Sequence, residues 1–373
     1  MLRPLICFFG NIAFLFKNRK LPSNPQNIVI MRSGGIGDVL MSTPLVKAIR
    51  LQFPNAKITY LVGEWSSDAI KGNPNVDKVM TYDDNIIFKQ DKQEVKKLIE
   101  RIKEEKFDLA FILDKAWQWN VLAFMAKIPF RLGFDRKGEG FACNISVPFD
   151  GKKYELEYYR DLAHIAGVEE APYEMQFYIT KKDGQKAEQL FKKHKLSKNR
   201  TIALIPGGAK NPGQELPEKR WPPHLYGRLA DELLSKKWQI VILGGKTDEE
   251  ICNSVIRNMK RKTAVNLCGK LSLGQSAAFM QNAKLAVTHD SGPMHLAAAM
   301  HTPLVAIFGP TDPMRFAPLS ARIVQDTRLC PPCYDIYGNL KNQKGSLSAI
   351  AVDIVLKEIL STNEVKSKRK KRR

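Results

Sequence analysis

The sequence predicts an α/β protein built from two doubly wound domains, each with a parallel sheet covered by helices on both faces. The chain has 373 residues, a length that is typical of two domains. Hydrophobic residues make up 44% of it, which allows sizeable cores and argues against wholesale disorder. Short apolar runs, typical of strands that are buried on both faces, alternate along the chain with amphipathic helical patterns.

The strands and helices fall into two series, which a polar helical pattern at residues 182–195 separates, so we expect the domains to join near residue 180. Apolar runs predict strands at residues 28–31, 58–62, 109–113, 202–205, 240–243, 285–288 and 304–308. Amphipathic patterns predict helices at residues 44–53, 94–105, 224–236 and 274–281. Ligands of such sheets bind beyond the carboxyl ends of the strands, so a site in a cleft between the domains is expected.

The net charge is +21, and the excess of bases is concentrated at the two ends. Residues 1–23 contain four bases and no acid, and the tail KSKRKKRR at 366–373 contains seven bases and no acid. The apolar stretch at residues 5–16 is too short to cross a bilayer, which takes about 20 helical residues. No small-x-small cleavage site follows it, as a signal peptide would need. We interpret residues 1–23 as a segment in the membrane interface; the alternative is a helix packed on the protein's own surface.

The basic tail favours an anionic membrane face as its partner, with nucleic acid as the competing one. No recognised nucleic-acid-binding module accompanies it, so nucleic acid is not expected. The single C-x-x-C pair, Cys330 and Cys333, lacks the four ligands of a tetrahedral zinc site. We interpret both residues as ordinary thiols, with a redox or metal role as the alternative.

The first motif, RSGGIGDVLMSTPLVKAI at 32–49, joins the first predicted strand to a helix. Its glycines allow a sharp turn and the close approach of another molecule. Proline is best accommodated in the first turn, so the regular helix is expected to start between Met41 and Pro44. The motif is neither a Walker loop nor a good dinucleotide fingerprint, which disfavours a dehydrogenase. Asp38 is either a helix N-cap or a general base that a substrate hydroxyl can reach.

The second motif, HDSGPMHLAAAM at 289–300, follows another predicted strand. Ser291 is a good N-cap and Pro293 a good first-turn residue, so an anion such as phosphate is expected at Ser291 and Gly292. His295 would point back toward this end of the helix, beside Asp290.

Two further glycine turns follow strands in the second half of the chain. PGG at 206–208 contains Gly207 and Gly208, and Lys219 and Arg220 come shortly after it. Cations near such a turn can neutralise a diphosphate leaving group. The turn GGKTDEE at 244–250 brings Asp248 and Glu249, and either carboxylate can accept hydrogen bonds from ribose hydroxyls.

The chain resembles the bacterial heptosyltransferases of lipopolysaccharide core assembly, glycosyltransferase family 9. The resemblance runs from about residue 27 to 318 and rests on segments in the expected order. These are SGGIGDVLMSTPLVKAIR, NPNVDKVMTYD, FDLAFILD, RLGF, PGGAKNPGQELPEKRWP, LGGKTDEE, LCGKLSL and HDSGPMHLAAAMHTPLVAIFGPTDP. It implies a GT-B fold, in which two Rossmann-like domains face each other across a cleft, and an inverting transfer from a nucleotide-activated sugar, typically ADP-heptose, without metal or cofactor.

By position, the resemblance makes Asp38 the proposed base, Lys219 the phosphate-binding lysine and Asp290 the acid near the donor sugar. It makes Ser291 and Gly292 pyrophosphate contacts, and places the ribose carboxylate on Asp248 or Glu249. The remaining predicted donor residues are Gly207, Gly208 and His295; the predicted acceptor-side loop consists of Ser33, Gly34, Gly35 and Gly37. The loop at 209–218 is longer than in some family members, and both ends of the chain lie outside the family core.

The resemblance also assigns roles to the domains: 24–180 binds the acceptor, and 181–345 binds the nucleotide-sugar. A C-terminal helix at 346–362 and a basic tail at 363–373 follow. A lipid-linked anionic saccharide is the expected acceptor of a protein on the cytoplasmic face of the inner membrane. The alternatives are another nucleotide-sugar enzyme of this fold, such as an epimerase, and a basic nucleic-acid-binding protein.

Overall fold

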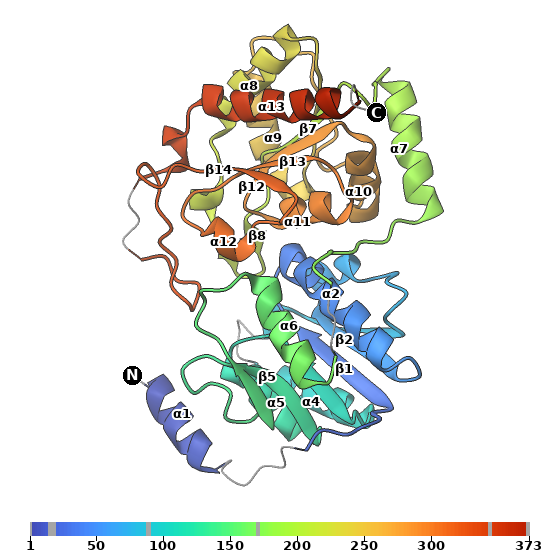
Figure 1. The fold of residues 1–373 in the computed structure, drawn as a ribbon, viewed down its shortest axis with the longest axis vertical. Helices are drawn as coiled ribbons and strands as arrows, with labels where there is room; N and C mark the ends of the chain where they lie inside the picture. The colour runs from blue at the N-terminus through green and yellow to red at the C-terminus, as the bar shows by residue number, and fades with distance from the viewer. Residues whose placement is uncertain (1, 14–19, 87–90, 169–171, 342–344, 371–373) are drawn as a thin grey trace. The chain divides into compact units, whose positions relative to one another are not determined.

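The computed structural model describes residues 2–13, 20–86, 91–168, 172–341 and 345–370, and it divides into two compact units (Figure 1). Unit 1 comprises Met1–Gln176 with Asn211–Gly213, and unit 2 comprises Phe177–Lys210 with Gln214–Arg373. The main boundary therefore lies close to the junction expected near residue 180.

Unit 1 contains a six-stranded sheet in the order β3-β2-β1-β4-β5-β6, and all the neighbouring strands run parallel. Its strands are β1 (Asn27–Arg32), β2 (Lys57–Gly63), β3 (Lys78–Tyr82), β4 (Leu109–Ile112), β5 (Phe130–Asp135) and β6 (Ile145–Pro148). The order reverses between β1 and β4, and ligands of open α/β sheets bind beyond the carboxyl ends of the strands at such a point.

Helices cover both faces of the unit 1 sheet. On one face α4 (Lys92–Glu104) and α5 (Trp117–Met125) bury Ile99 and Ala123 against strand residues such as Met31. On the other face lie α2 (Ile36–Gln52) and α6 (Glu155–Ile165), where the Ser42 and Tyr60 hydroxyls form a 2.5 Å hydrogen bond between α2 and the sheet. A further helix, α1 (Leu2–Ala13), packs beside α5.

Unit 2 repeats this architecture with a parallel sheet in the order β11-β10-β7-β12-β13-β14, which reverses between β7 and β12. Its strands are β7 (Thr201–Ile205), β10 (Gln239–Ile242), β11 (Val265–Asn266), β12 (Leu285–His289), β13 (Leu304–Ile307) and β14 (Ala321–Val324). A separate two-stranded ribbon is formed by β8 (Lys210–Asn211) and β9 (Gln214–Glu215).

A core cluster of unit 2 lies between one face of its sheet and the helices α8 (Pro223–Ser235), α9 (Glu249–Asn258) and α13 (Val352–Lys370). On the other face are α7 (Lys181–Lys193), α10 (Leu273–Asn282) and α11 (Gly292–Ala299) (Figure 1). Phe191 of α7 stacks on Phe279 of α10 with their ring centroids 4.7 Å apart. The short helix α12 (Pro313–Phe316) follows β13.

All the predicted strands are present, each with ends within one residue of the expectation. The strands that the sequence did not predict in the two large sheets are β3, β5, β6, β11 and β14. Four of them, β3, β6, β11 and β14, form the edges of the sheets. An edge strand is covered on fewer sides, so its sequence lacks the continuous apolar run of a central strand.

The expected start of α2 between Met41 and Pro44 is wrong, because the helix begins at Ile36 and contains Pro44 in its interior. A proline inside a helix has no N–H, so the backbone carbonyl four residues earlier lacks its helical hydrogen-bond donor. Here that carbonyl belongs to Leu40, and it accepts a 2.7 Å hydrogen bond from the Thr43 hydroxyl. The side chain next to the proline thus replaces the missing backbone donor.

The end of the chain also differs from the expected helix at 346–362. A short 3-10 turn at Leu347–Ala349 comes first, and α13 then runs from Val352 to Lys370. The Ile350 carbonyl between them accepts a 3.0 Å hydrogen bond from the buried indole N–H of Trp221, which holds the chain in a non-helical conformation there.

Candidate active site

A tight glycine turn at the carboxyl end of β1 sets the position of Asp38 in unit 1. Gly34 has φ +103°, and a Cβ added to it would lie 2.6 Å from Oδ2 of Asp38, so this position requires glycine. Gly35 is the N-cap residue of α2, and Gly37 is buried in the first turn. The glycines therefore serve to bring the Asp38 carboxylate back over the turn.

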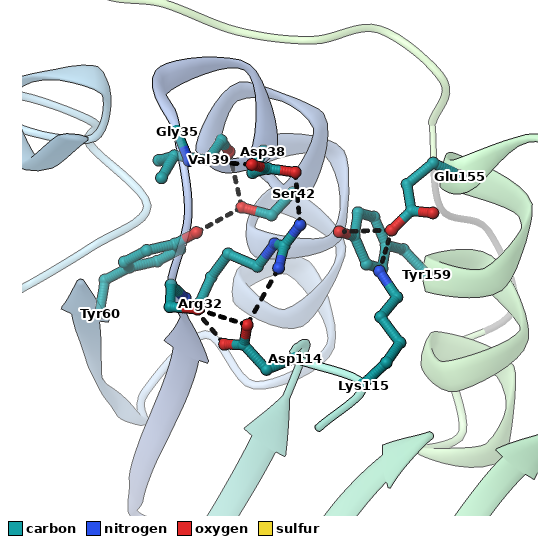
Figure 2. A network of polar contacts seen from close by, with 11 residues as sticks. Arg32, Gly35, Asp38, Val39, Ser42, Tyr60, Asp114, Lys115, Glu155 and Tyr159 are labelled. Atoms are coloured by element: carbon teal, nitrogen blue, oxygen red, sulfur yellow. Dashed lines mark hydrogen bonds and ion pairs between the residues drawn. The ribbon is translucent and has the colours of Figure 1, made fainter. Parts of the chain in front are cut away.

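Both oxygens of the Asp38 carboxylate are held by the protein (Figure 2). Asp38 is not the N-cap that the sequence offered as one interpretation, because Gly35 holds that position and Asp38 is the third residue of α2. Its Oδ2 accepts a 2.9 Å hydrogen bond from the Gly35 N–H. Oδ1 accepts from the Arg32 guanidinium at 2.6 Å. The side chain of Asp38 is still 32% exposed, against 9% for Arg32. A carboxylate has more than two acceptor positions, so an approaching hydroxyl can also bind here.

Asp114, just after β4, holds the glycine turn that follows β1 in place. Its carboxylate accepts from the Ser33 N–H at 2.7 Å, from the Ser33 hydroxyl at 2.5 Å and from Arg32 at 3.1 Å. Arg32 therefore bridges Asp114 and Asp38 (Figure 2). Burial opposes the guanidinium charge, but these carboxylates and Tyr159 keep the pKa of Arg32 above its ordinary value.

A second buried ion pair lies in the same network. Lys115 pairs with Glu155 of α6, and Glu155 also accepts a 3.1 Å hydrogen bond from the Tyr159 hydroxyl (Figure 2). The Lys115 ammonium lies 5.1–5.4 Å from the centroids of the Phe134, Phe149 and Tyr159 rings. Burial lowers the pKa of Lys115, and the contact with Glu155 offsets part of that shift.

In unit 2, the glycine turn after β7 is tied to the turn after β10 by Asp248. One Asp248 oxygen accepts from the Gly208 N–H and the other from the Gly245 N–H, both at 2.9 Å. A Cβ on Gly207 would lie 2.3 Å from Cγ of Asp248, so glycine is required for this approach. Asp248 is buried, whereas Glu249 is exposed, with its carboxylate next to Gly269.

Gly208 also lies against the loop after β12. It has φ +85°, and a Cβ there would lie 3.0 Å from Cβ of Ser291. Its carbonyl accepts a 2.9 Å hydrogen bond from Arg220, so Arg220 supports the turn. The residues that follow β7 and β12 are thus side by side at the point where the order of the unit 2 strands reverses.

The predicted cation and acid of unit 2 form an ion pair, because Nζ of Lys219 lies 3.0 Å from Oδ2 of Asp290. Burial raises the pKa of the Asp290 carboxyl, but Lys219, with smaller contributions from Thr311 and His295, holds this pKa below its ordinary value. The Lys219 ammonium also lies 5.2 Å from the ring centroid of Tyr334, whose hydroxyl donates to Glu218. An ammonium carries three donors, so Lys219 can bind a phosphate oxygen while it holds Asp290.

The start of α11 lies beside this pair. Ser291 takes the predicted N-cap position, but its hydroxyl donates to the His289 carbonyl at 3.2 Å and does not cap the helix. Gly292 is the first helical residue, and the first turn contains no acid. The positive end of the helix dipole is therefore available to an anion. His295 is buried in this helix and contributes to lowering the pKa of Asp290.

Several residues of these clusters were not predicted. In unit 1 they are Arg32, Asp114, Lys115, Glu155 and Tyr159. Arg32 and Asp114 stand directly at the ends of strands, a signal that could have identified them. Glu155 comes from α6, and nothing in its local sequence relates it to Lys115. In unit 2, Tyr334 was not predicted as a neighbour of Lys219. It follows the C-x-x-C pair, whose Cys330 and Cys333 are free thiols.

His289, which directly precedes Asp290, is expected to make the stability of unit 2 depend on pH. Its imidazole is fully buried, and Nδ1 lies 3.3 Å from the Tyr226 hydroxyl. Burial lowers its pKa from 6.5 to about 3. The unfolded chain therefore binds a proton below pH 6.5 that the folded chain does not, so stability falls as the pH decreases from there.

The slope expected from this one group approaches about 1.4 kcal/mol per pH unit. Urea unfolding of unit 2 between pH 6.5 and pH 4.5, compared for the wild type and His289→Gln, measures it. The variant is expected to have the lower overall stability and the flatter pH profile. Parallel profiles for the two proteins would show that His289 does not titrate in this way.

Among the residues that the structure describes, no cluster of three His, Cys, Asp or Glu side chains is placed to hold a metal ion. Within the same ranges, no helix is both long and apolar enough to cross a membrane.

Comparison with known proteins identifies the family. The sequence profile of glycosyltransferase family 9 (heptosyltransferase) matches residues 95–340. Lipooligosaccharide heptosyltransferase 2 of Haemophilus influenzae is 28% identical over 79% of this chain and 86% of its own length. Lipopolysaccharide heptosyltransferase 2 of Escherichia coli K12 is 28% identical over 80% of this chain and 88% of its own.

Solved structures agree with this assignment. E. coli ADP-heptose lps heptosyltransferase II matches with a TM-score of 0.70 and 26% identity, over 90% of this chain and 98% of that one. A glycosyltransferase of family 9 from Veillonella parvula matches with a TM-score of 0.75 and 24% identity, over 90% and 96%. The predicted GT-B fold is confirmed. The chain belongs to glycosyltransferase family 9, the heptosyltransferases, and is a glycosyltransferase.

Proposed function

We propose that the protein transfers heptose from ADP-heptose to a saccharide of the lipopolysaccharide core, with inversion at the anomeric carbon and without a metal ion. One observation carries the proposal: each unit gathers its predicted site residues at the carboxyl ends of its own central strands. The similarity to heptosyltransferases over about four-fifths of the chain supports heptose as the sugar.

Unit 1 binds the acceptor in this proposal, and Asp38 is the general base. An acceptor hydroxyl donates a hydrogen bond to the Asp38 carboxylate and transfers its proton there as its oxygen attacks the anomeric carbon. Arg32 and the Gly35 N–H fix the direction of the carboxylate, so the hydroxyl is met by a positioned acceptor. The acceptor-side turn of Ser33, Gly34, Gly35 and Gly37 leaves room for the sugar.

Unit 2 binds the donor, and its cations stabilise the leaving group. The bond from the anomeric carbon to the phosphate oxygen breaks as the new glycosidic bond forms, and the nucleoside diphosphate takes the electron pair. Negative charge then grows on the β-phosphate, where Lys219 and the start of α11 at Ser291 and Gly292 stabilise it. Asp290 orients Lys219 and lies next to the position proposed for the donor sugar.

Measurement of the product tests the proposed reaction. Incubation with ADP-heptose and a lipopolysaccharide core acceptor that lacks the heptose is expected to add one heptosyl residue, with the opposite anomeric configuration to the donor. Mass spectrometry and NMR of the product measure both. An isomerised donor in the absence of acceptor would support the epimerase alternative, and transfer with retention would contradict the role of Asp38.

The two candidate ribose carboxylates are expected to behave differently when they are neutralised. Glu249 is exposed and is therefore the one proposed to bind the ribose, whereas both Asp248 oxygens already accept backbone N–H groups. Glu249→Gln should weaken ADP binding by about tenfold with an unchanged melting temperature, since hydrogen bonds to charged groups contribute about 1.5–3 kcal/mol. Asp248→Asn should lower the melting temperature.

Calorimetric titration with ADP and thermal unfolding of the two variants separate these effects. Equal ADP affinity of the wild type and Glu249→Gln would remove Glu249 from the site. Glu250, exposed on the same helix, supplies a matched control, and Glu250→Gln is expected to bind ADP like the wild type.

We further propose that the acceptor is lipid-linked and anionic, and that the enzyme acts on the cytoplasmic face of the inner membrane as a peripheral protein. The similarity to enzymes of lipopolysaccharide and lipooligosaccharide assembly and the net charge of +21 support this.

A further inference from the structure

The helix α1 at the start of the chain is fixed on unit 1 by one of its sides. Cys7 is buried against Phe141 and Ala142. A Cβ on Gly10 would lie 2.6 Å from the Phe141 ring, so glycine allows the helix to approach closely. The Asn11 side chain donates to the Gly138 carbonyl at 3.2 Å. Packing and this hydrogen bond together determine which side of α1 faces away from unit 1.

The outward side of α1 consists of large apolar residues. The exposed fractions are 56% for Leu5, 60% for Phe8, 63% for Phe9 and 51% for Ile12. We name these four residues the α1 face. Monomeric proteins in water rarely place so many large apolar side chains on one helix side, and such surfaces typically mark a binding site.

The neighbouring helix α5 adds to this apolar surface. Trp117 and Val121 of α5 pack against the cluster that contains α1. Phe124 and Met125 come three and four residues after Val121, and they are 46% and 54% exposed. The spacing puts them on the same side of α5 as the residues that contact α1.

Two exposed lysines flank the segments that pack against α1. Lys127 follows the end of α5, and Lys137 precedes Gly138, to which α1 is bound; both lysines are exposed. Glu139 is buried and pairs with Arg136 at 2.5 Å. Residues 1–23 add four bases and no acid. Large apolar side chains next to exposed basic residues are typical of helices that lie in the interface of an anionic membrane.

We propose that the α1 face binds the surface of an anionic phospholipid bilayer, with α1 parallel to the membrane plane and its apolar side chains at the boundary of headgroups and acyl chains. The proposal names the part of the protein that makes the membrane contact proposed above. It rests on α1, α5 and the residues that flank them, and it does not depend on the transfer reaction.

A second copy of the chain fits this surface less well. A stable interface takes about 20–30 residues from each partner, far more than the α1 face and the end of α5 provide. Pairing two copies through this surface would also bring the exposed Lys127 and Lys137 of both copies close together, and like charges repel. An anionic bilayer satisfies both the apolar and the basic groups.

Sedimentation with vesicles tests the proposal. The wild type is expected to bind vesicles that contain phosphatidylglycerol, and to bind purely phosphatidylcholine vesicles much more weakly. Phe8→Ser/Phe9→Ser should weaken binding to the anionic vesicles by about tenfold or more, because binding scales with buried apolar area. Lys127→Gln/Lys137→Gln should weaken it by several fold at low salt and have little effect at high salt.

A matched control removes apolar side chains elsewhere. Leu51 and Leu319 are 67% and 74% exposed, and Leu51→Ser/Leu319→Ser is expected to bind vesicles like the wild type. Because the replaced residues are exposed, all variants should keep the wild-type melting temperature.

Three outcomes would overturn the proposal. The first is wild-type vesicle binding by Phe8→Ser/Phe9→Ser, since another basic region such as the tail would then carry it. The second is equal binding of the wild type to neutral and anionic vesicles. The third is a concentration-dependent dimer without vesicle binding that Phe8→Ser/Phe9→Ser dissociates, which would assign the surface to a second copy. None of these depends on whether the protein transfers heptose.

Discussion

Replacement of Asp38 by asparagine is expected to lower the rate of sugar transfer by about 10²–10⁴-fold, the usual contribution of a general base. The asparagine amide has nearly the same size and retains one oxygen acceptor, which can bind either Arg32 or the Gly35 N–H. It cannot take a proton from the acceptor hydroxyl at neutral pH. Single-turnover transfer assays with saturating donor and acceptor measure the chemical step directly.

The structure predicts that this variant still binds the donor, because all the proposed donor residues lie in unit 2, whereas Asp38 lies in unit 1. ADP affinity should therefore stay within about twofold of the wild type, since the substitution changes none of the residues proposed to contact ADP. A parallel loss of ADP binding and transfer would indicate a folding defect, and transfer at the wild-type rate would exclude Asp38 as the base.

Asp77 provides a matched control for this experiment. Like Asp38, it pairs with an arginine, Arg50, and accepts a backbone hydrogen bond, from Ile58 at 2.7 Å. Ile58 lies near the start of β2, so this pair is at the opposite end of the sheet from the glycine turn. Asp77→Asn is expected to leave transfer unchanged. If it lowered transfer as much as Asp38→Asn, the loss would reflect disruption of an ion pair and not loss of a base.

The central strands could be predicted because they are buried on both faces, and burial imposes a continuous apolar run. The glycine positions could be predicted as well, since Gly34 and Gly208 have positive φ angles that other residues rarely adopt. Local sequence therefore indicated where the turns of both candidate sites lie. It also identified Lys219 and Asp290, but not that they form an ion pair.

Contacts between distant segments could not be predicted from one sequence. Arg32 and Asp114 are 82 residues apart, and Lys115 and Glu155 are 40 apart. Nothing in the local sequence shows which partner each of these side chains contacts, and only the order of β1 and β4 in the sheet brings the first two together. The sequence also could not decide whether Asp38 is a cap or a base. The capping contact depends on where the helix starts, and the presence of Pro44 led to a predicted start that is too late.

Exchange of Lys219 for glutamine is expected to have the largest effect in unit 2. Loss of one donor that stabilises charge on a leaving group typically costs about 10²–10³-fold in rate. The ammonium lies beside the start of α11 and has donors left beyond its 3.0 Å contact with Asp290. Binding of ADP should weaken much more than binding of adenosine, because only ADP carries the phosphates that Lys219 is proposed to contact.

Glutamine at this position also leaves the buried Asp290 without its cation, so the variant could lose affinity merely by distorting the loop. The comparison of ADP with adenosine separates the two causes, because a distorted loop would weaken both ligands. Lys219→Arg retains the charge and should recover part of the ADP affinity. Lys198, which pairs with Glu188 on the surface of unit 2, gives the control, and Lys198→Gln should bind both ligands like the wild type. If the ratio of ADP affinity to adenosine affinity were the same in Lys219→Gln as in the wild type, the phosphates would bind elsewhere.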